Sequence, residues 1–531
     1  MKENLSWTRW IVTTTMLAAL AGCGMKPMGM ENFEGYTGAA PTSMEPAPSP
    51  TYDSMKSEEY EIINENSFVK AIDKPLSTSA VDVDTASYSI VRRSIDQGSL
   101  PPKDAVRIEE LINYFSYAYP EPEDEHPFSV TSEVSSCPWN HKHRLARIGL
   151  KGKSVSMENL PPSNLVFLVD VSGSMTSRLD LVKSALRLLT QNLREQDRIS
   201  IVVYAGSAGL ILPPTSGNAK AKIFGALDKL KAGRSTAGGE GIQLAYKTAK
   251  ENLLESGNNR VILATDGDFN VGPSSRSELL QLIQEQRKEG IFLTMLGFGM
   301  GNYKDAKVEL VADKGNGLYA YIDSLPEARK VLVKEIAGML LTIAKDVKIQ
   351  VEFNPAKVES YRLIGYENRA LKDEDFKDDK KDAGEIGAGH TVTALYEIVP
   401  QTTPLDADKR SLTFSETKIK PEALKSKEIL KVSLRYKEPK EMKSKLLVRS
   451  VVNEERLSDI SDDLRFAAAV VEFGLLLRDS PHKGDAAYEN VIKVAQGARG
   501  VDKEGYRADF IKLVEAVKAL VKSGKIAAND S

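Results

Sequence analysis

An unbroken apolar stretch that ends on an acid constrains this chain more than any other feature. Residues 165–175 read Leu-Val-Phe-Leu-Val-Asp-Val-Ser-Gly-Ser-Met. A short, continuous apolar run is typical of a strand buried on both faces, as in a parallel sheet. Asp170, Ser172 and Ser174 follow where that strand leaves the sheet, and the carboxyl ends of such strands form ligand crevices. Because hard cations such as Mg²⁺ prefer oxygen ligands, the stretch predicts a metal site.

The Asp-x-Ser-x-Ser pattern resembles the metal-ion-dependent adhesion site of von Willebrand factor type A domains. That motif continues with a threonine on a later loop and an aspartate at the end of a later strand. This chain has Thr236 in Ser-Thr-Ala-Gly-Gly-Glu and Asp266 directly after Val-Ile-Leu-Ala-Thr. The resemblance covers roughly residues 163–345. It implies that Ser172, Ser174 and Thr236 contact the cation, while Asp170 and Asp266 act directly or through water.

The expected ligand set also indicates the ion and its use. Small hydroxyl ligands with few carboxylates favour Mg²⁺, with Mn²⁺ or Ca²⁺ as alternatives, because Ca²⁺ prefers larger shells with more carboxylates. A shell that carries little protein charge leaves the cation electrophilic, with one coordination position open. The carboxylate of an Asp or Glu from a partner protein is the natural ligand for that position. The resemblance therefore implies a binding module with no catalytic residues.

The amino-terminal segment predicts membrane attachment. Lys2 and Arg9 precede the apolar stretch 10–21, as in a secretory signal peptide. The ending Leu-Ala-Gly-Cys resembles a bacterial lipobox, which implies cleavage before Cys23 and attachment of lipid, including palmitate, to this residue. Gly24 in place of Asp favours the outer membrane in a Gram-negative host. Residues 24–60 are rich in Pro, Ser, Gly, Met, Thr and Glu, a composition typical of a flexible tether.

Composition disfavours several other classes of protein. A net charge of −3 gives no electrostatic basis for binding nucleic acid. The 5 histidines and 2 cysteines form no visible zinc pattern or Ser–His–Asp order, which disfavours a hydrolase. If Cys23 carries lipid, Cys137 is left as a single thiol, and we expect it to be a packed small residue. The alternative is a catalytic thiol near His141 and His143.

The fold expected for the whole chain is α/β: a central doubly wound, Rossmann-like type A domain between an amino-terminal α+β region and a carboxyl-terminal β-rich plus helical region. The predicted central strands are 165–170, 198–204, 209–212, 260–265, 291–297 and 318–322. The predicted central helices are 178–193, 219–230, 241–254, 276–288, 304–313 and 326–344. The predicted core includes Val202, Val203, Ile262, Leu263, Leu293 and Leu296. The predicted domains are 1–22 signal peptide, 23–66 tether, 67–160 α+β, 161–345 type A, 346–450 β-rich and 451–531 helical.

The flanking segments give weaker patterns. Apolar spacing predicts a helix over 104–115 with Asp104 as its N-cap, and helices over 459–478 and 484–522. Alternation predicts strands over 128–134, 145–150, 347–353, 391–399 and 427–436. The segments Asp-Val-Asp-Thr-Ala-Ser-Tyr at 82–88 and Cys-Pro-Trp-Asn at 137–140 resemble YfbK-like bacterial lipoproteins. His390 resembles part of the same family pattern, and we expect it to be structural.

Asp82 and Asp84 permit two interpretations. Phosphoryl-transfer enzymes of the haloacid dehalogenase type use an Asp-x-Asp pair after a buried strand. Here the preceding residues Pro-Leu-Ser-Thr-Ser-Ala make a poor buried strand, so the motif lacks its context. A turn with solvated acids is the better interpretation.

Together these observations predict a membrane-anchored lipoprotein that binds a protein partner through a divalent-cation site. Two alternatives stay open. The first is a structural envelope lipoprotein whose metal only stabilises the fold, and the second is a periplasmic hydrolase.

Overall fold

The computed structural model describes residues 58–205, 207–233, 239–267, 276–299, 303–402, 419–452 and 460–523, which belong to one compact unit. The predicted signal peptide, Cys23, most of the predicted tether and Thr236 lie outside the described residues. No helix within the described ranges is both long and apolar enough to cross a membrane.

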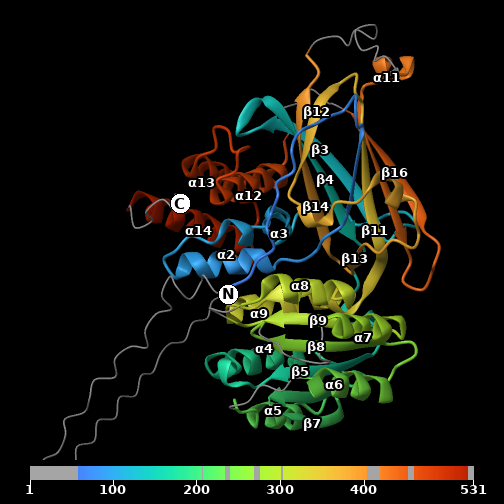
Figure 1. Cartoon of the computed structure of the whole chain (residues 1–531), viewed down its shortest axis with the longest axis vertical. Helices are drawn as coiled ribbons and strands as arrows, with labels where there is room; N and C mark the ends of the chain where they lie inside the picture. Colours follow the sequence, from blue (N-terminus) through green and yellow to red (C-terminus); the bar gives the residue numbers. More distant parts are fainter. Residues whose placement is uncertain are drawn as a thin grey trace, which may run out of the picture. The chain divides into compact units, whose positions relative to one another are not determined.

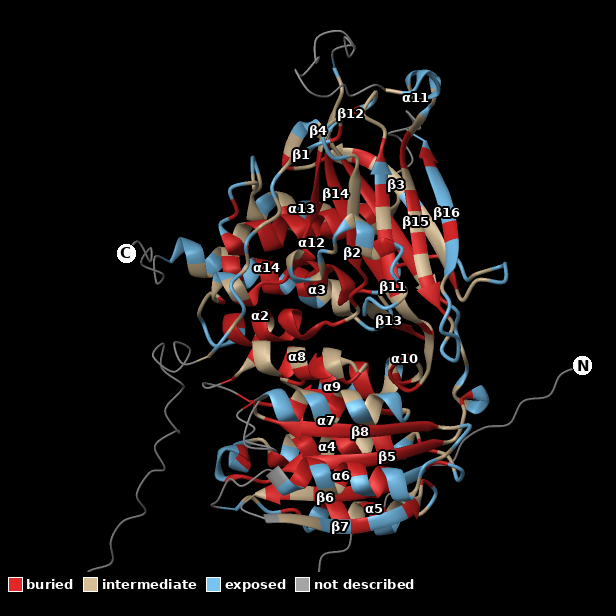
Figure 2. Cartoon of the chain, turned by 45° about the vertical axis from the view of Figure 1, so that its right-hand side comes forward, coloured by how far each residue is buried: buried red, intermediate tan, exposed pale blue. Residues whose placement is uncertain are grey.

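A six-stranded sheet forms the centre of the type A fold, in the strand order β10-β9-β8-β5-β6-β7 (Figure 1). Its strands are β5 (Ser163–Asp170), β6 (Arg198–Ala205), β7 (Ser207–Ser216), β8 (Asn258–Thr265), β9 (Ile291–Gly297) and β10 (Tyr319–Tyr321). All pairings are parallel except that of β7 with β6. Every residue of β5 is buried, as its continuous apolar run predicts, and Figure 2 shows this burial along β5 and β8. The predicted strands and the doubly wound class are confirmed.

Helices cover both faces of this sheet because side chains alternate along each strand. Leu165 and Phe167 face a cluster that contains residues of α4 (Leu179–Gln191), α5 (Lys220–Asp228) and α9 (Leu325–Arg329). Val166 and Leu168 face α6 (Gly239–Glu251), α7 (Arg276–Lys288) and α8 (Asp305–Lys314). Of the six predicted core residues, only Val203 is partly exposed.

The predicted helix 326–344 is helical as far as Leu340, with a π-helical turn in its middle, and is wrong only over its last four residues. After α9 the backbone widens into a π-helical turn, Lys330–Lys334, and α10 (Ile336–Leu340) ends the helical segment. From Thr342 the chain alternates apolar and polar residues as strand β11 (Thr342–Phe353), which pairs with two other strands. Hydrogen bonds to neighbouring strands therefore make residues 342–344 a strand, although the apolar spacing of the preceding residues predicts that the helix continues.

Two antiparallel sheets follow from pairing between segments far apart in the sequence. The first has the order β1-β12-β14-β4-β3, and the second has the order β13-β11-β15-β16, with β2 also paired to β11. The strands are β1 (Val69–Lys70), β2 (Leu76–Ala80), β3 (Phe128–Cys137), β4 (Asn140–Gly152), β12 (Val358–Ile364), β13 (Gly384–Gly387), β14 (Thr391–Pro400), β15 (Glu428–Lys437) and β16 (Lys445–Val452). Strands from residues 67–160 thus share sheets with strands from residues 346–450. The domain boundaries stay predictions. The pairing shows that the two segments form these two sheets together.

The remaining helices pack into one aromatic-rich cluster. They are α2 (Ala86–Asp96), α3 (Ile108–Asn113), α12 (Asp462–Arg478), α13 (Tyr488–Gly497) and α14 (Tyr506–Lys522); the short α11 (Pro421–Lys425) lies apart from this cluster. The predicted helix 484–522 is interrupted where Gly500 and Gly505 adopt positive φ angles. The predicted N-cap is also wrong: α3 begins after Arg107, and Asp104 instead accepts a hydrogen bond from the backbone N–H of Ile63.

The interpretation of Asp82 and Asp84 as solvated acids is wrong. Both side chains are buried, and the guanidinium of Arg369 lies 3.4 Å from Asp82 and 3.5 Å from Asp84. Asp84 also accepts a hydrogen bond from the backbone N–H of Tyr319, the first residue of β10. These acids therefore hold the amino-terminal segment against the type A fold.

Candidate metal centre

Asp170 is the buried anchor of the predicted metal site. It ends β5, between the parallel strands β6 and β8, and its side chain is fully buried. Its Oδ1 accepts a 2.8 Å hydrogen bond from the backbone N–H of Ser172. Its Oδ2 accepts hydrogen bonds from the hydroxyls of Tyr204, at 3.0 Å, and Thr265, at 3.4 Å. Strands β5, β6 and β8 thus all contribute to fixing one carboxylate.

The two predicted serine ligands lie side by side on the loop after β5. Their hydroxyl oxygens are 2.9 Å apart, with Ser172 buried and Ser174 exposed. Ser172 is extended, and the chain then forms a 3₁₀ turn, Gly173–Ser177, whose Met175 is buried in the core below. Two hydroxyls at this separation can both reach one cation, because each can turn a lone pair toward the same point.

Asp266 follows directly after β8 and is half-buried. The next residue, Gly267, has φ +86°, and a Cβ there would lie 2.8 Å from Cδ2 of Tyr303. A left-handed glycine in close contact with its neighbours therefore sets the direction in which the chain leaves this acid. The structure thus places Asp266 beside the end of the strand that neighbours β5.

Thr236, the fifth predicted ligand, lies outside the described residues. The chain that leads to it can be followed as far as Gly233, whose N–H donates a 2.6 Å hydrogen bond to the carbonyl oxygen of Val171. The segment before Thr236 therefore starts beside the serine loop.

Electrostatics at this edge of the sheet favour a cation. Burial raises the pKa of Asp170, and the negative charge of Asp266 raises it further, while hydrogen bonds from Ser172 act in the opposite direction. A divalent cation would compensate the charge of two neighbouring carboxylates. Among the described residues no group of three or more His, Cys, Asp or Glu could hold a metal ion, so the fit depends on hydroxyl oxygens. Hydroxyls with few carboxylates suit Mg²⁺.

Tyr204 is a residue that sequence reasoning missed. It is fully buried at the end of β6, in register with Asp170 on β5. The available signal was its place as the last residue of the predicted strand 198–204, because parallel neighbours end at the same edge of a sheet. Its role as a hydrogen-bond donor to Asp170 needed the register.

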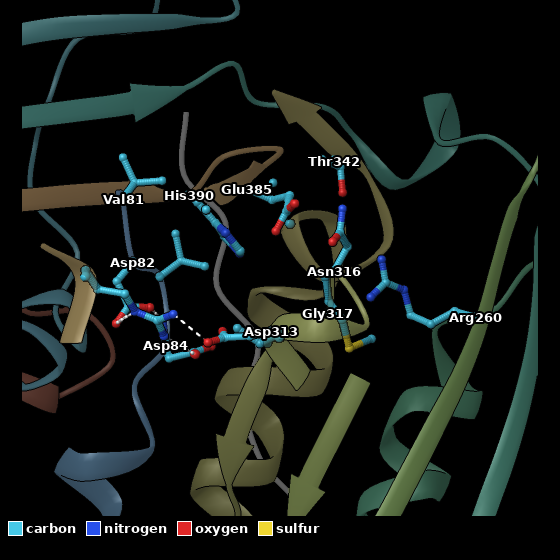
Figure 3. Close-up of a pocket in the computed structure, with 17 residues that line it drawn as sticks. Val81, Asp82, Asp84, Arg260, Asp313, Asn316, Gly317, Thr342, Glu385 and His390 are labelled. Carbon is cyan, nitrogen blue, oxygen red and sulfur yellow. Dashed lines mark hydrogen bonds and ion pairs between the residues drawn. The ribbon is translucent and has the colours of Figure 1, made fainter. Parts of the chain in front are cut away.

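A polar cavity of about 60 Å³ is lined by none of the predicted metal-site residues, and Figure 3 shows its lining. Its lining includes Asp84, Arg260, Glu385 and His390. The His390 ring packs against Gly338 of α10, and burial together with the charges of Lys330 and Lys151 lowers its pKa to about 4. Its half-buried position and lowered pKa favour a neutral ring, which agrees with the predicted structural role. A cavity lined by so many polar groups is suited to ordered water.

Cys137 is buried in the helical cluster next to Trp139. Burial raises the pKa of its thiol. Because thiolates are the reactive form, this environment matches the interpretation of Cys137 as a packed small residue.

Comparisons with known proteins match three parts of the chain. The family described as "Uncharacterized protein YfbK, C-terminal" matches residues 338–520, "von Willebrand factor" matches 54–147, and "von Willebrand factor type A domain" matches 165–268. The "Uncharacterized protein YfbK" of Escherichia coli K12 is 43% identical over 465 residues, which is 86% of this chain and 80% of that protein.

More distant similarities cover smaller parts or lower identities. Human inter-alpha-trypsin inhibitor heavy chain H3 is 24% identical, over 45% of this chain and 28% of that protein. Among solved structures, a von Willebrand factor type A protein from Catenulispora acidiphila is 15% identical, covering 75% of this chain and 92% of that chain, with a TM-score of 0.40.

Proposed function

Because this chain belongs to the YfbK family of bacterial proteins with a von Willebrand factor type A domain, we propose that it is a lipid-anchored envelope protein that binds a protein partner through a divalent cation. Type A domains are protein-interaction modules, and the proposal adds the cation and the anchor. The observation that carries it is the pair of hydroxyls of Ser172 and Ser174, 2.9 Å apart. They lie beside the buried carboxylate of Asp170 at the carboxyl end of the sheet.

In this proposal each residue has one task. Ser172 and Ser174 contact the cation, which is most simply Mg²⁺, and Thr236 supplies a third hydroxyl from its own loop. Asp170 and Asp266 balance the charge of the ion, directly or through water. The cation supplies a Lewis-acidic position for a carboxylate of the partner, an Asp or Glu side chain.

A pull-down from envelope extract tests the binding function. The bait is the chain from Glu31 to Ser531, which lacks Cys23, in Mg²⁺, in EDTA, and as the double variant Ser172→Ala, Ser174→Ala. We expect a partner that is retained only by the unaltered chain in Mg²⁺. A set of partners that is indifferent to metal and mutation, with the circular dichroism spectrum unchanged, contradicts the proposal.

The alternative of a structural metal is distinguished by denaturation. If the ion only stabilises the fold, Asp170→Ala in Mg²⁺ lowers the free energy of unfolding. Any loss of partner binding then matches the fraction of the variant that is unfolded. If the ion serves adhesion, the variant stays folded and loses the partner.

The lipid anchor is tested separately, with labelled palmitate in growing cells. We expect the label in the unaltered protein and none in the Cys23→Ser variant, with the unaltered protein in the outer-membrane fraction. Labelling that persists in the variant contradicts the anchor and leaves the cation site untouched.

A further inference from the structure

The first described residues of the chain are fastened to the type A fold next to the metal centre. Glu59 forms a parallel bridge with Lys304, in which the N–H of Glu59 donates to the carbonyl oxygen of Tyr303 at 3.0 Å. The ammonium of Lys304 lies 2.7 Å from the carboxylate of Glu59. Tyr60 packs against the buried cluster on that face of the sheet. We call residues Glu58–Tyr60 the strap.

Arg93 of α2 connects the strap to the strands that end beside the metal centre. This arginine is buried, and its Nη2 donates a 2.7 Å hydrogen bond to the carboxylate of Glu58. Its Nη1 donates to the hydroxyl of Tyr321 on β10, at 2.7 Å, and to the carbonyl oxygen of Gly299, at 3.3 Å. Tyr321 also donates to the same carbonyl oxygen of Gly299. One buried guanidinium thus joins the strap to the chain that follows β9.

Gly299 and Tyr303 in turn pack directly against the Asp266 turn. A Cβ on Gly299 would lie 2.2 Å from the carbonyl oxygen of Asp266, so the two backbones are in contact with no side chain between them. Tyr303 is fully buried and fills the space beside Gly267. Because protein interiors are close-packed, a shift of Gly299 or Tyr303 must move the backbone of Asp266.

From these contacts we propose that Arg93 and the strap position Asp266 and thereby set the cation affinity of the metal centre. This inference rests on the proposed function. Arg93 and Glu58 are positioning residues: they act on the ion through the backbone of Asp266. The strap lies within the predicted tether, 23–66, and is its first described part, so a load on the residues before it reaches the Glu58–Arg93 ion pair before it reaches any strand of the sheet. The affinity for the cation then depends on whether the strap is bound to the type A fold.

The experiment measures Mg²⁺ binding by calorimetry to the full-length chain in detergent, with Mg²⁺ alone as the probe. The test variant is Glu58→Gln, which breaks the ion pair with Arg93 without creating a cavity. The matched control is Glu133→Gln, which removes the same charge from the ion pair with Arg147, 2.9 Å apart, between β3 and β4. Both variants lose one buried or half-buried carboxylate that is paired with an arginine.

We expect the dissociation constant for Mg²⁺ to rise about tenfold in Glu58→Gln, the lower end of the effect of groups that orient metal ligands. In Glu133→Gln it should stay unchanged, although both variants melt earlier. An equal dissociation constant in the two variants overturns the inference, since a purely structural role moves only the melting temperature.

A second measurement separates this inference from the proposed function. Amide hydrogen exchange in EDTA follows the segment 258–267, and we expect faster exchange near Asp266 in Glu58→Gln but not in Glu133→Gln. If the unaltered chain binds no Mg²⁺, the proposed function fails, while the exchange result still decides whether the strap positions the Asp266 turn. Equal exchange in both variants overturns the positioning.

Discussion

The hydroxyl of Tyr204 donates a 3.0 Å hydrogen bond to Oδ2 of Asp170, its in-register neighbour on the adjacent strand. A hydrogen bond to a buried carboxylate contributes more than one between neutral groups, since it also offsets the cost of burying the charge. Tyr204 also contacts α6, because a Cβ on Gly241 would lie only 2.7 Å from the Cβ of Tyr204. This tyrosine therefore links the acid of the candidate metal centre to the helix that follows Thr236.

Replacing Tyr204 by Phe should destabilise the chain by about 1.5–3 kcal/mol, because Asp170 loses a donor while remaining buried. Urea denaturation in EDTA measures this change. The matched control is Tyr246→Phe: the hydroxyl of Tyr246 is buried and has no hydrogen-bond partner among the described residues. Its removal should be close to neutral. Equal losses in the two variants would show that the hydroxyl of Tyr204 contributes nothing specific.

Gly241→Ala should destabilise the chain by about 1–3 kcal/mol, because the added methyl overlaps the Cβ of Tyr204 and pushes α6 away from the sheet. The same shift moves the helix that begins just after Thr236, so Mg²⁺ should also protect the variant less against thermal unfolding. The control is Gly225→Ala in α5, where an added Cβ meets no atom within 4 Å. Alanine is the better helix former, so this control should gain up to about 1 kcal/mol.

Local patterns predicted the metal centre and the central sheet, whereas long-range pairing was hidden from the sequence. Asp170, Ser172 and Ser174 lie within five consecutive positions at the end of one buried strand. Their placement therefore needs only the direction of that strand. The pairing of Asp82 and Asp84 with Arg369, some 285 positions later, has no local signal. The end of the predicted helix 326–344 is wrong for the same reason: the strands that pair with β11 lie elsewhere in the chain.

Replacing Arg369 by Met should destabilise the chain by about 3–5 kcal/mol, because it leaves buried carboxylates without the positive charge of the guanidinium. The guanidinium lies 2.6 Å from Asp313 and 3.3 Å from Glu309, in addition to Asp82 and Asp84. Chemical denaturation at neutral pH measures the loss. Arg449→Met is the control: its ion pair with Asp124, at 3.1 Å, is about half exposed on both sides, and exposed pairs contribute about 1 kcal/mol or less. A small loss for Arg369→Met would contradict the role of this network in joining the segments.

His390 should make the stability of the chain fall as the pH falls from about 7 to 4. Its pKa is lowered from 6.5 to about 4, first by burial and then by the charges of Lys330 and Lys151. Between these two values the unfolded chain binds a proton that the folded chain does not, so acid favours unfolding. The difference amounts to about 3 kcal/mol at pH 4.

The measurement is the free energy of unfolding of the unaltered chain and of His390→Asn at a series of pH values. Because buried carboxylates also titrate, the informative quantity is the free energy of unfolding of the unaltered chain minus that of His390→Asn. This difference should fall by about 3 kcal/mol as the pH is lowered from 7 to 4. His141→Asn is the control, since His141 is exposed and its replacement should leave the pH dependence unchanged. Parallel curves for His390→Asn and the unaltered chain would mean that the ring is reached by water or by a hydrogen-bond acceptor in solution. In that case the neutral state of the folded protein's His390 described above would be wrong.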